Sequence, residues 1–413
     1  MGRFVNPDNS AFQAALNSRI YVDKTGMIEY MNRVLETTDA YICNSRPRRF
    51  GKSYAANMLA AYYSKGADSE MMFSDLSIGK TQDFKKYLNK YDVIHIDIQW
   101  FLANCAKADD VVAFITESIL DELRTIYPCV LPSEEISLPD ALSRIREKTG
   151  QKFVVIIDEW DVLIRDEAQN HTLQEAYIDF LRGMFKGTEP SRYIALAYLT
   201  GILPIKKIKD ESALNNFREY TMLKSKPIGK YYGFTEEEVK GLCKEYDMDF
   251  DAVKAWYNGY LIDGVHMYNP NSVVQSMMDK DYDSYWRNTS SFASINTFIT
   301  MNYAGLKDDI MKMLAGGKVM VNPNTFQNDF STIASKDDAL TALIHLGYLG
   351  YDADRKSAYV PNYEVATAFE LALQTGGWKE IAKAISTCDE LLFETIDGNA
   401  EKVAELIELA HDT

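Results

Sequence analysis

Short apolar runs, rich in β-branched residues, alternate with longer amphipathic segments through the first half of the chain. The runs predict strands over residues 40–44, 93–100, 153–159 and 193–201. Because the segments between them have helical spacing, each crossover contains a helix, and strands joined in this way lie parallel. The pattern therefore predicts an α/β fold, a three-layer sandwich in which helices cover both faces of a parallel sheet.

The sequence pattern changes after about residue 228, where it predicts helices joined by aromatic-rich connectors. Thr235 and Glu238 form the pattern of a capping box at the start of one helix. From about residue 337 the order is helix, strand, polar turn, strand, helix, which winged helices share with small helical domains that have no nucleic-acid role. We therefore expect three regions: an α/β domain over 1–228, a helical lid over 229–300, and a mostly helical C-terminal region over 301–413, with a winged helix as one alternative for its shape.

Composition limits the environment and the partners. The 60 acidic and 44 basic residues give a formal charge of −16, which disfavours a chain that coats DNA through its overall field, although a local basic patch stays compatible with it. The chain has no apolar stretch of ~18 residues and no signal-peptide core, so we expect a cytoplasmic protein without a membrane span. The scattered cysteines contain no CxxC pair and are expected to be core or neutral thiols: Cys43, Cys105, Cys129, Cys243 and Cys388.

The segment SRPRRFGKSYAANML follows the first predicted strand and opens a helix, which is the context of a phosphate-binding loop. Backbone N–H groups would surround the phosphates of ATP, Lys52 would contact the β and γ phosphates, and the Ser53 hydroxyl would hold Mg²⁺. The usual GxxxxGK[ST] pattern begins with glycine, and Arg46 stands at that position here. The predicted loop residues are Arg46, Pro47, Arg48, Arg49, Phe50, Gly51, Lys52, Ser53 and Tyr54.

The loop arginines leave three alternatives open. Arg46, Arg48 and Arg49 are compatible with direct phosphate contacts, with an arginine finger that faces a neighbouring subunit or domain, and with a solvated surface loop. We expect a role close to the phosphates, without assigning it to one of the three.

Two carboxylates follow the apolar run FVVII, as expected of a central strand that delivers acids to its C-terminal edge. Asp158 would stabilise Mg²⁺ and Glu159 would polarise the attacking water, although an acid pair at a strand end can also simply cap the next turn. Asp161 is ambiguous between loop structure and metal support. Thr200, at the end of another strand, would sense the γ-phosphate or form a hydrogen-bonded turn.

Short motifs extend this pattern along nearly the whole chain: YVDKT (21–25), RPRRFGKS (46–53), VVIIDEWD (154–161), LTGILPI (199–205), ALNNF (213–217), YYGFTEEEV (231–239), YNPNSVV (268–274), YWRNTSS (285–291) and HLGYLGYD (345–352). In this combination the chain resembles the bacterial AAA-ATPase-like family, whose members often carry a C-terminal nuclease-like domain of the PD-(D/E)xK type. The resemblance implies that arginine in place of the first loop glycine is normal, and that Asp23 and Lys24 lie close to the nucleotide base.

The resemblance would place a nuclease-like domain after the helical segment 401–413, but the sequence ends at Thr413. No strand pair that offers Asp followed by Glu-x-Lys is visible, so we do not expect this polypeptide to cut DNA by itself.

We expect Mg²⁺-dependent ATP hydrolysis that is coupled to movement of the helical C-terminal region and regulates a nuclease or another effector; a homo-oligomer is a second candidate partner. The alternatives are a nucleotide-dependent binding switch with little turnover and a DNA-binding regulator. The scarcity of basic residues in 337–373 weakens the DNA alternative.

Overall fold

The computed structural model describes residues 1–132, 135–208, 211–285, 303, 305–375, 391–392 and 394–411. Cys388 and the part of the expected lid beyond Tyr285 lie outside these residues. No helix among the described residues is long and apolar enough to cross a bilayer.

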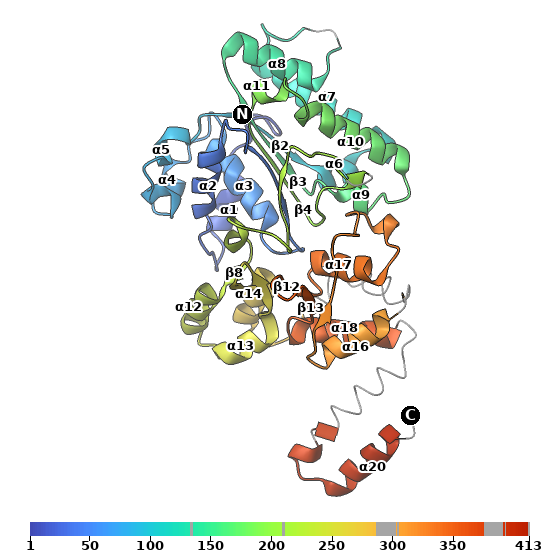
Figure 1. Ribbon diagram of the computed structural model, residues 1–413. Helices are drawn as coiled ribbons and strands as arrows, with labels where there is room; N and C mark the ends of the chain where they lie inside the picture. Colours follow the sequence, from blue (N-terminus) through green and yellow to red (C-terminus); the bar gives the residue numbers. More distant parts are fainter. Residues whose placement is uncertain are drawn as a thin grey trace.

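A five-stranded sheet forms the centre of the N-terminal region (Figure 1). All of its neighbouring strands pair in parallel. Across the sheet the order is β2 (Asp92–Asp97), β3 (Phe153–Asp158), β4 (Ile194–Gly201), β1 (Tyr41–Ser45) and β7 (Arg218–Tyr220). The predicted α/β fold with a parallel sheet is therefore confirmed.

Helices cover both faces of this sheet, and β3 shows why (Figure 1). Its residues are all buried and alternate between two apolar cores: Val155 and Ile157 belong to one core, and Val154 and Ile156 belong to the other. The first core includes side chains from α6 (Ile98–Asn104), α7 (Val111–Ile126), α8 (Leu138–Thr149) and α10 (His171–Phe185), and the second includes side chains from α1 (Ser10–Leu16), α2 (Gly26–Val34) and α3 (Lys52–Tyr63).

The apolar run expected as one strand over 93–100 divides into a strand and a helix. Strand β2 ends at Asp97, whose carboxylate accepts a hydrogen bond from the Trp100 N–H at 3.1 Å and so caps α6. The predicted strand was too long because apolar residues continue into the helix without a break in the pattern.

The region after residue 228, expected to be a helical lid, contains a small sheet as well as helices. It contains an antiparallel sheet with the strand order β8 (Phe234–Thr235), β10 (Val265–Tyr268) and β9 (Tyr260–Ile262). The turn between β9 and β10 is Asp263-Gly264, both with positive φ, which is the geometry of a tight hairpin. Helices α12 (Glu236–Tyr246), α13 (Phe250–Tyr257) and α14 (Pro270–Asp279) accompany the sheet, and the capping box at Thr235 and Glu238 is confirmed.

The last packed unit has the order predicted for 337–373. Helix α17 (Lys336–Leu346) is followed by the hairpin β12 (Gly350–Asp352) and β13 (Ser357–Tyr359) and by α18 (Tyr363–Thr375). Strand β11 (Val319–Met320), which follows α16 (Leu306–Leu314), pairs with β13 and extends the hairpin to three strands. A winged helix and the three domain boundaries stay predictions.

The C-terminal unit shares an apolar core with the N-terminal region. This core joins Phe50, Ile202 and Leu203 to side chains of α16, α17 and α18, and all three of these residues are buried. The segment that leaves β4 and the loop that follows β1 are therefore packed directly against the C-terminal unit.

Candidate nucleotide-binding site

The loop between β1 and α3 has the backbone that a phosphate-binding loop requires. Arg49 and Gly51 both have positive φ, of 67° and 87°, so the chain turns sharply before α3 begins at Lys52. Glycine adopts this conformation without steric cost, which explains Gly51 at the second of these positions. The turn presents the N-terminus of a 12-residue helix, where unpaired N–H groups favour an anion.

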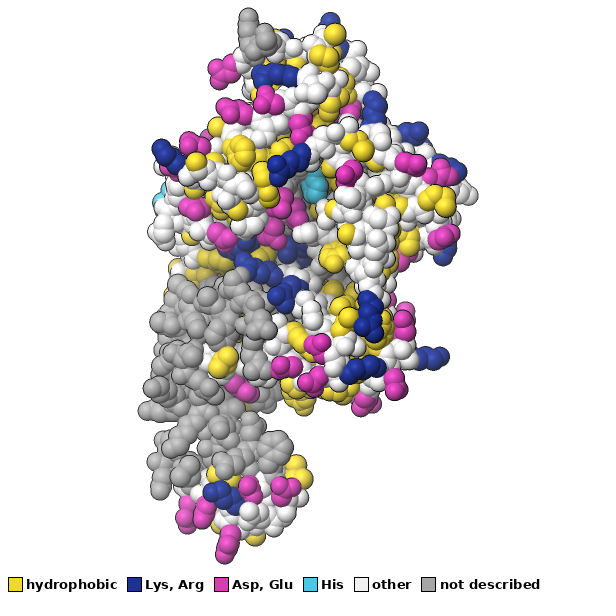
Figure 2. All heavy atoms as spheres, turned by 180° about the vertical axis from the view of Figure 1, so that it is seen from behind, with side chains coloured by type: hydrophobic (Ala, Val, Ile, Leu, Met, Phe, Trp, Pro, Cys, Tyr) yellow, Lys and Arg dark blue, Asp and Glu magenta, His cyan; other side chains and the backbone are white. Residues whose placement is uncertain are grey.

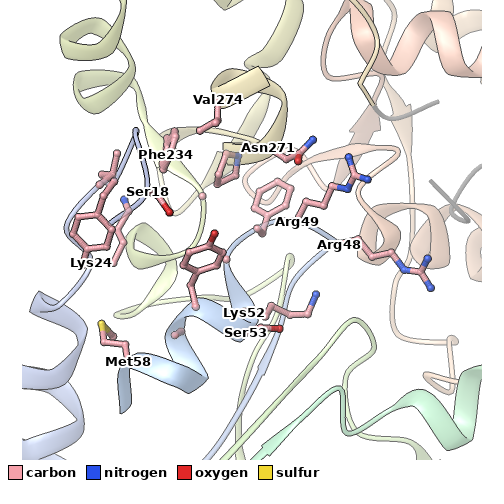
Figure 3. Close-up of a pocket in the computed structure, with 18 of the residues that line it drawn as sticks. Ser18, Lys24, Arg48, Arg49, Lys52, Ser53, Met58, Phe234, Asn271 and Val274 are labelled. Atoms are coloured by element: carbon pink, nitrogen blue, oxygen red, sulfur yellow. The ribbon is translucent and has the colours of Figure 1, made fainter. Parts of the chain in front are cut away.

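A cavity of about 1160 Å³ opens over this helix N-terminus. Figure 3 shows residues of its wall from three parts of the chain: the loop and α3, the N-terminal segment with Ser18 and Lys24, and the later unit with Phe234, Asn271 and Val274. In the space-filling view from behind, basic side chains gather in the hollow at the middle of the molecule, next to acidic ones (Figure 2). The cavity thus combines a cationic floor with carboxylates, as a site for a metal-bound phosphate needs.

Two of the predicted catalytic residues, Lys52 and Glu159, and the two predicted metal ligands, Ser53 and Asp158, line the cavity together. Lys52 Nζ lies 3.7 Å from Glu159 Oε1 and donates a hydrogen bond to the Pro47 carbonyl oxygen at 3.1 Å. Lys52 and Ser53 belong to the first turn of α3, and their side chains extend in the same direction (Figure 3). Asp158 and Glu159 come from the C-terminal end of β3 and also line the cavity. The structure therefore brings together Lys52, Ser53, Asp158 and Glu159, four of the residues that the sequence assigned to phosphate, metal and water.

Asp158 is a buried carboxyl group with a raised pKa. Burial raises its pKa to about 7; the Ser53 hydroxyl, which hydrogen-bonds to the carboxylate, and Lys52 oppose this rise, and Glu159 adds to it. The pairing of a serine hydroxyl with a carboxylate supplies hard oxygen ligands, which suit Mg²⁺. Ser53 and Asp158 would hold this ion, which would neutralise charge on the phosphates of the bound nucleotide.

Asp161 has a structural role. Its side chain is fully buried, and its oxygens accept hydrogen bonds from the Ile202 N–H at 3.2 Å and the Leu203 N–H at 2.8 Å. It also pairs with Arg165 at 3.1 Å. Asp161 thus ties the turn after β3 to the chain that leaves β4, and metal support is not its function in this arrangement.

Four predicted site residues do not line the cavity: Arg46, Pro47, Asp23 and Thr200. The Arg46 side chain is fully buried, donates to the Ser45 and Tyr220 carbonyl oxygens at 2.7 and 3.2 Å, and lies 5.3 Å from the centre of the Tyr232 ring. Burial lowers its pKa to about 10. Arg46 therefore joins the loop to β7 and does not line the cavity, so the expected role close to the phosphates stays a prediction for Arg48 and Arg49.

Thr200 and Asp23 stabilise the elements beside the cavity. Thr200 Oγ1 donates to the Asn44 carbonyl oxygen at 3.2 Å, so it links β4 to β1 and corresponds to the hydrogen-bonded alternative. Asp23 accepts hydrogen bonds from Thr25 and Ser77. Burial acts to raise the pKa of Asp23, but these hydrogen bonds outweigh burial, and the pKa lies below its usual value.

The other predicted residues border the cavity. Lys24 lines it and forms an ion pair with Glu238 at 2.7 Å, which ties the N-terminal segment to α12. Arg48 and Arg49 both line the wall, and Arg49 donates to the Tyr285 carbonyl oxygen at 3.3 Å. Tyr54 is exposed at the rim, whereas Phe50 is buried and packs edge-on against Tyr260, with ring centres 5.2 Å apart.

Sequence reasoning missed several wall residues. Asp97 lies at the end of β2, opposite Asp158 in the sheet register, and an apolar run that ends in an acid was a signal for it as it was for Asp158. Arg165, four residues after Asp161, contacts Glu159 at 3.6 Å. Phe234 and Asn271 reach the cavity from a part of the chain more than 180 residues after the loop, so no local pattern could place them there.

Comparison with known proteins finds a family that is similar to the N-terminal region. Residues 11–209 match the model of a family described as predicted AAA-ATPase. This part of the chain, a little under half of its length, is similar to that family. The matched residues include the loop, the acid pair and β4. The match therefore confirms the resemblance to the AAA-ATPase-like family over residues 11–209.

Two further proteins are similar to the chain. An uncharacterized protein in the vnfD 5' region of Azotobacter chroococcum mcd 1 is 26% identical over 275 residues, which cover 66% of this chain and 51% of that protein. The chain thus spans about half the length of this curated relative. The structure of the Aeropyrum pernix ORC2 protein in ADPNP–ADP complexes matches with 11% identity and a TM-score of 0.31, over 89% of this chain and 98% of that one.

Proposed function

We propose that the protein binds Mg·ATP in this cavity and hydrolyses it. The observation that carries the proposal is the convergence of Lys52, Ser53, Asp158 and Glu159 at the N-terminus of α3. A lysine and a helix N-terminus bind phosphates, and a carboxylate beside them can orient water for in-line attack. Each group alone has a structural explanation, but their meeting at one end of a large cavity does not.

In the proposed reaction, the loop N–H groups and Lys52 would bind the β and γ phosphates, and Ser53 and Asp158 would hold a Mg²⁺ ion that neutralises charge on them. The Glu159 carboxylate accepts a hydrogen bond from a water molecule and aligns it with the γ-phosphorus atom. Glu159 is suited to this role because its side chain is 23% exposed and lines the cavity, whereas Asp158 is 5% exposed.

A direct test compares Lys52→Ala with Lys86→Ala, which removes an exposed lysine from α5 (Phe84–Tyr87). Lys52→Ala should weaken Mg·ATP binding by about 10²-fold or more, because it removes a charge-assisted contact to the phosphates. Lys86→Ala should bind as the wild type does. Equal Mg·ATP affinities of the two variants in a calorimetric titration would refute the loop assignment.

Turnover is proposed to act on the C-terminal unit through the chain that leaves β4. Lys206 Nζ forms an ion pair with the buried carboxylate of Asp329 at 2.7 Å, and the Asn328 side chain donates to the Ile205 carbonyl oxygen at 2.8 Å. On the loop side, the Phe50 carbonyl oxygen accepts a hydrogen bond from Gly233 N–H at 3.1 Å. A shift of the loop or of the chain that leaves β4 on nucleotide binding would therefore alter contacts with Gly233 and with residues 328–329.

Hydrogen exchange tests this coupling. Addition of Mg·ADP or of a non-hydrolysable Mg·ATP analogue should change amide exchange in residues 324–329 and 260–262, outside the nucleotide site itself. Exchange that changes only in the loop and α3 would contradict the coupling while leaving ATP binding intact.

A further inference from the structure

Arg165 is a nearly buried cation at the edge of the proposed catalytic centre. It ends the short helix α9 (Val162–Arg165), its side chain is 7% exposed, and it lines the cavity. Its guanidinium contacts three carboxylates: Asp161 at 3.1 Å, Asp166 at 2.9 Å and Glu159 at 3.6 Å. Burial would lower the pKa of Arg165, but Asp161 and Asp166 outweigh burial and raise it, so the side chain is cationic at any physiological pH.

The guanidinium is anchored by a carboxylate that does not line the cavity. Asp161, its buried partner, accepts hydrogen bonds from the backbone N–H groups of Ile202 and Leu203. Asp161 is thereby fixed to the end of the central strand β4, and Arg165 Nη1 is fixed to Asp161. The same nitrogen, Nη1, lies 3.6 Å from Glu159 Oε2, while Nε pairs with Asp166. A planar guanidinium held by both partners keeps Nη1 beside Glu159 in a defined direction, which a flexible ammonium group would not do.

Glu159 needs such a partner. Its backbone has a φ of +51°, a conformation that side-chain-bearing residues rarely adopt, and its carboxylate lies between Lys52 at 3.7 Å and Arg165 at 3.6 Å. If the nucleotide binds as proposed, Lys52 turns from Glu159 to the phosphates. Arg165 is then the cation that still contacts Glu159 through an anchored side chain.

We propose that Arg165 is a positioning residue for Glu159: it holds the carboxylate in the orientation that aligns the attacking water. This inference rests on the proposed ATP hydrolysis. A direct contact between Arg165 and the γ-phosphate is the competing role, and it differs in a measurable way. A positioning residue acts only when Glu159 is present, whereas a phosphate contact acts with or without it.

The experiment is a double-mutant cycle on single-turnover hydrolysis of Mg·ATP, with Mg·ATP and Mg·ADP affinities and thermal unfolding measured on each protein. Arg165→Met should lower the hydrolysis rate about 10- to 100-fold while changing either affinity less than about threefold. Arg165→Lys should recover part of the rate, because it keeps a positive charge beside Asp161 and Glu159 but loses the planar group that contacts both through Nη1 and Asp166 through Nε. Arg165→Met added to Glu159→Gln should slow hydrolysis no further.

Arg144→Met removes an exposed arginine that pairs with Asp140 at 3.1 Å on α8, and it serves as the matched control with wild-type rates. A further loss of rate in the Glu159→Gln background, or a selective loss of ATP over ADP affinity, would overturn the positioning role. If Arg165→Met fails to fold, the same comparison between Arg165→Lys alone and in the Glu159→Gln background decides. A wild type without ATP turnover would instead refute the proposed function itself.

Discussion

Asp161→Ala should strongly destabilise the protein, because one buried side chain satisfies three groups. Its oxygens accept from two backbone N–H groups, Ile202 and Leu203, and pair with Arg165. Each buried N–H left without an acceptor costs about 1–3 kcal/mol, so these two groups alone give about 2–6 kcal/mol. Arg165 keeps Asp166 and Glu159, which limits the added cost of its lost partner. We therefore expect the free energy of unfolding to fall by about 3–5 kcal/mol, in the range of a broken buried ion pair.

Asp166→Ala provides the matched comparison, because it removes a partner from the same arginine at a site where the carboxylate is 39% exposed. This variant should lose about 1 kcal/mol or less. Urea unfolding at pH 8, followed by tryptophan fluorescence, measures both changes, provided that the slopes of the transitions agree with that of the wild type. An Asp161→Ala variant as stable as Asp166→Ala would refute the assignment of Asp161 as the link between the turn after β3 and the chain that leaves β4.

Two further predictions concern buried charge. Asp158 has a pKa of about 7 in the folded protein against an ordinary value of 3.8, so the folded state binds the proton more tightly, and stability falls as the pH rises between these values. Without Mg²⁺, Asp158→Asn should be more stable than the wild type at pH 8 by up to about 4 kcal/mol, since each tenfold change in proton affinity is worth about 1.4 kcal/mol. The gain in the free energy of unfolding, measured by urea titration, should vanish towards pH 4. Equal stabilities of the two proteins at pH 8 would contradict this prediction. Arg46→Gly restores the common loop motif but removes a fully buried side chain with two backbone partners, so it should cost about 3 kcal/mol or more and lower ATP turnover. Thermal unfolding and steady-state turnover that match the wild type would show that the interior position of Arg46 has no consequence.

The α/β architecture was predictable because its signals are local. Continuous apolar runs mark strands that are buried on both faces, and the residues just beyond such a run reach the edge of the sheet, as Asp158 and Glu159 do. The phosphate-binding loop was predictable for the same reason, since Gly51 and Lys52 lie at the start of a helix that follows a strand after a short loop.

Side-chain direction was harder to predict, because it depends on residues distant in the sequence. Arg46 points inward to Tyr220, which lies 174 positions away, and no residue in the loop itself predicts that partner. The place of Phe234 and Asn271 in the cavity wall could not be predicted for the same reason. For Arg165 only part of the arrangement was predictable. Its position four residues after Asp161 makes an ion pair on a helical turn predictable. Its contact with Glu159 was not, because that contact depends on the left-handed backbone at Glu159.

Single-turnover hydrolysis by Glu159→Gln tests the central claim most directly. The substitution removes the carboxylate that would orient water but keeps the volume of the side chain, so Mg·ATP should bind with near wild-type affinity and persist. Hydrolysis should slow by about 10²- to 10⁴-fold, which corresponds to about 3–5 kcal/mol of lost transition-state stabilisation. If Glu159→Gln hydrolyses bound Mg·ATP as fast as an active wild type, Glu159 is not the group that orients the water and the proposed mechanism is wrong.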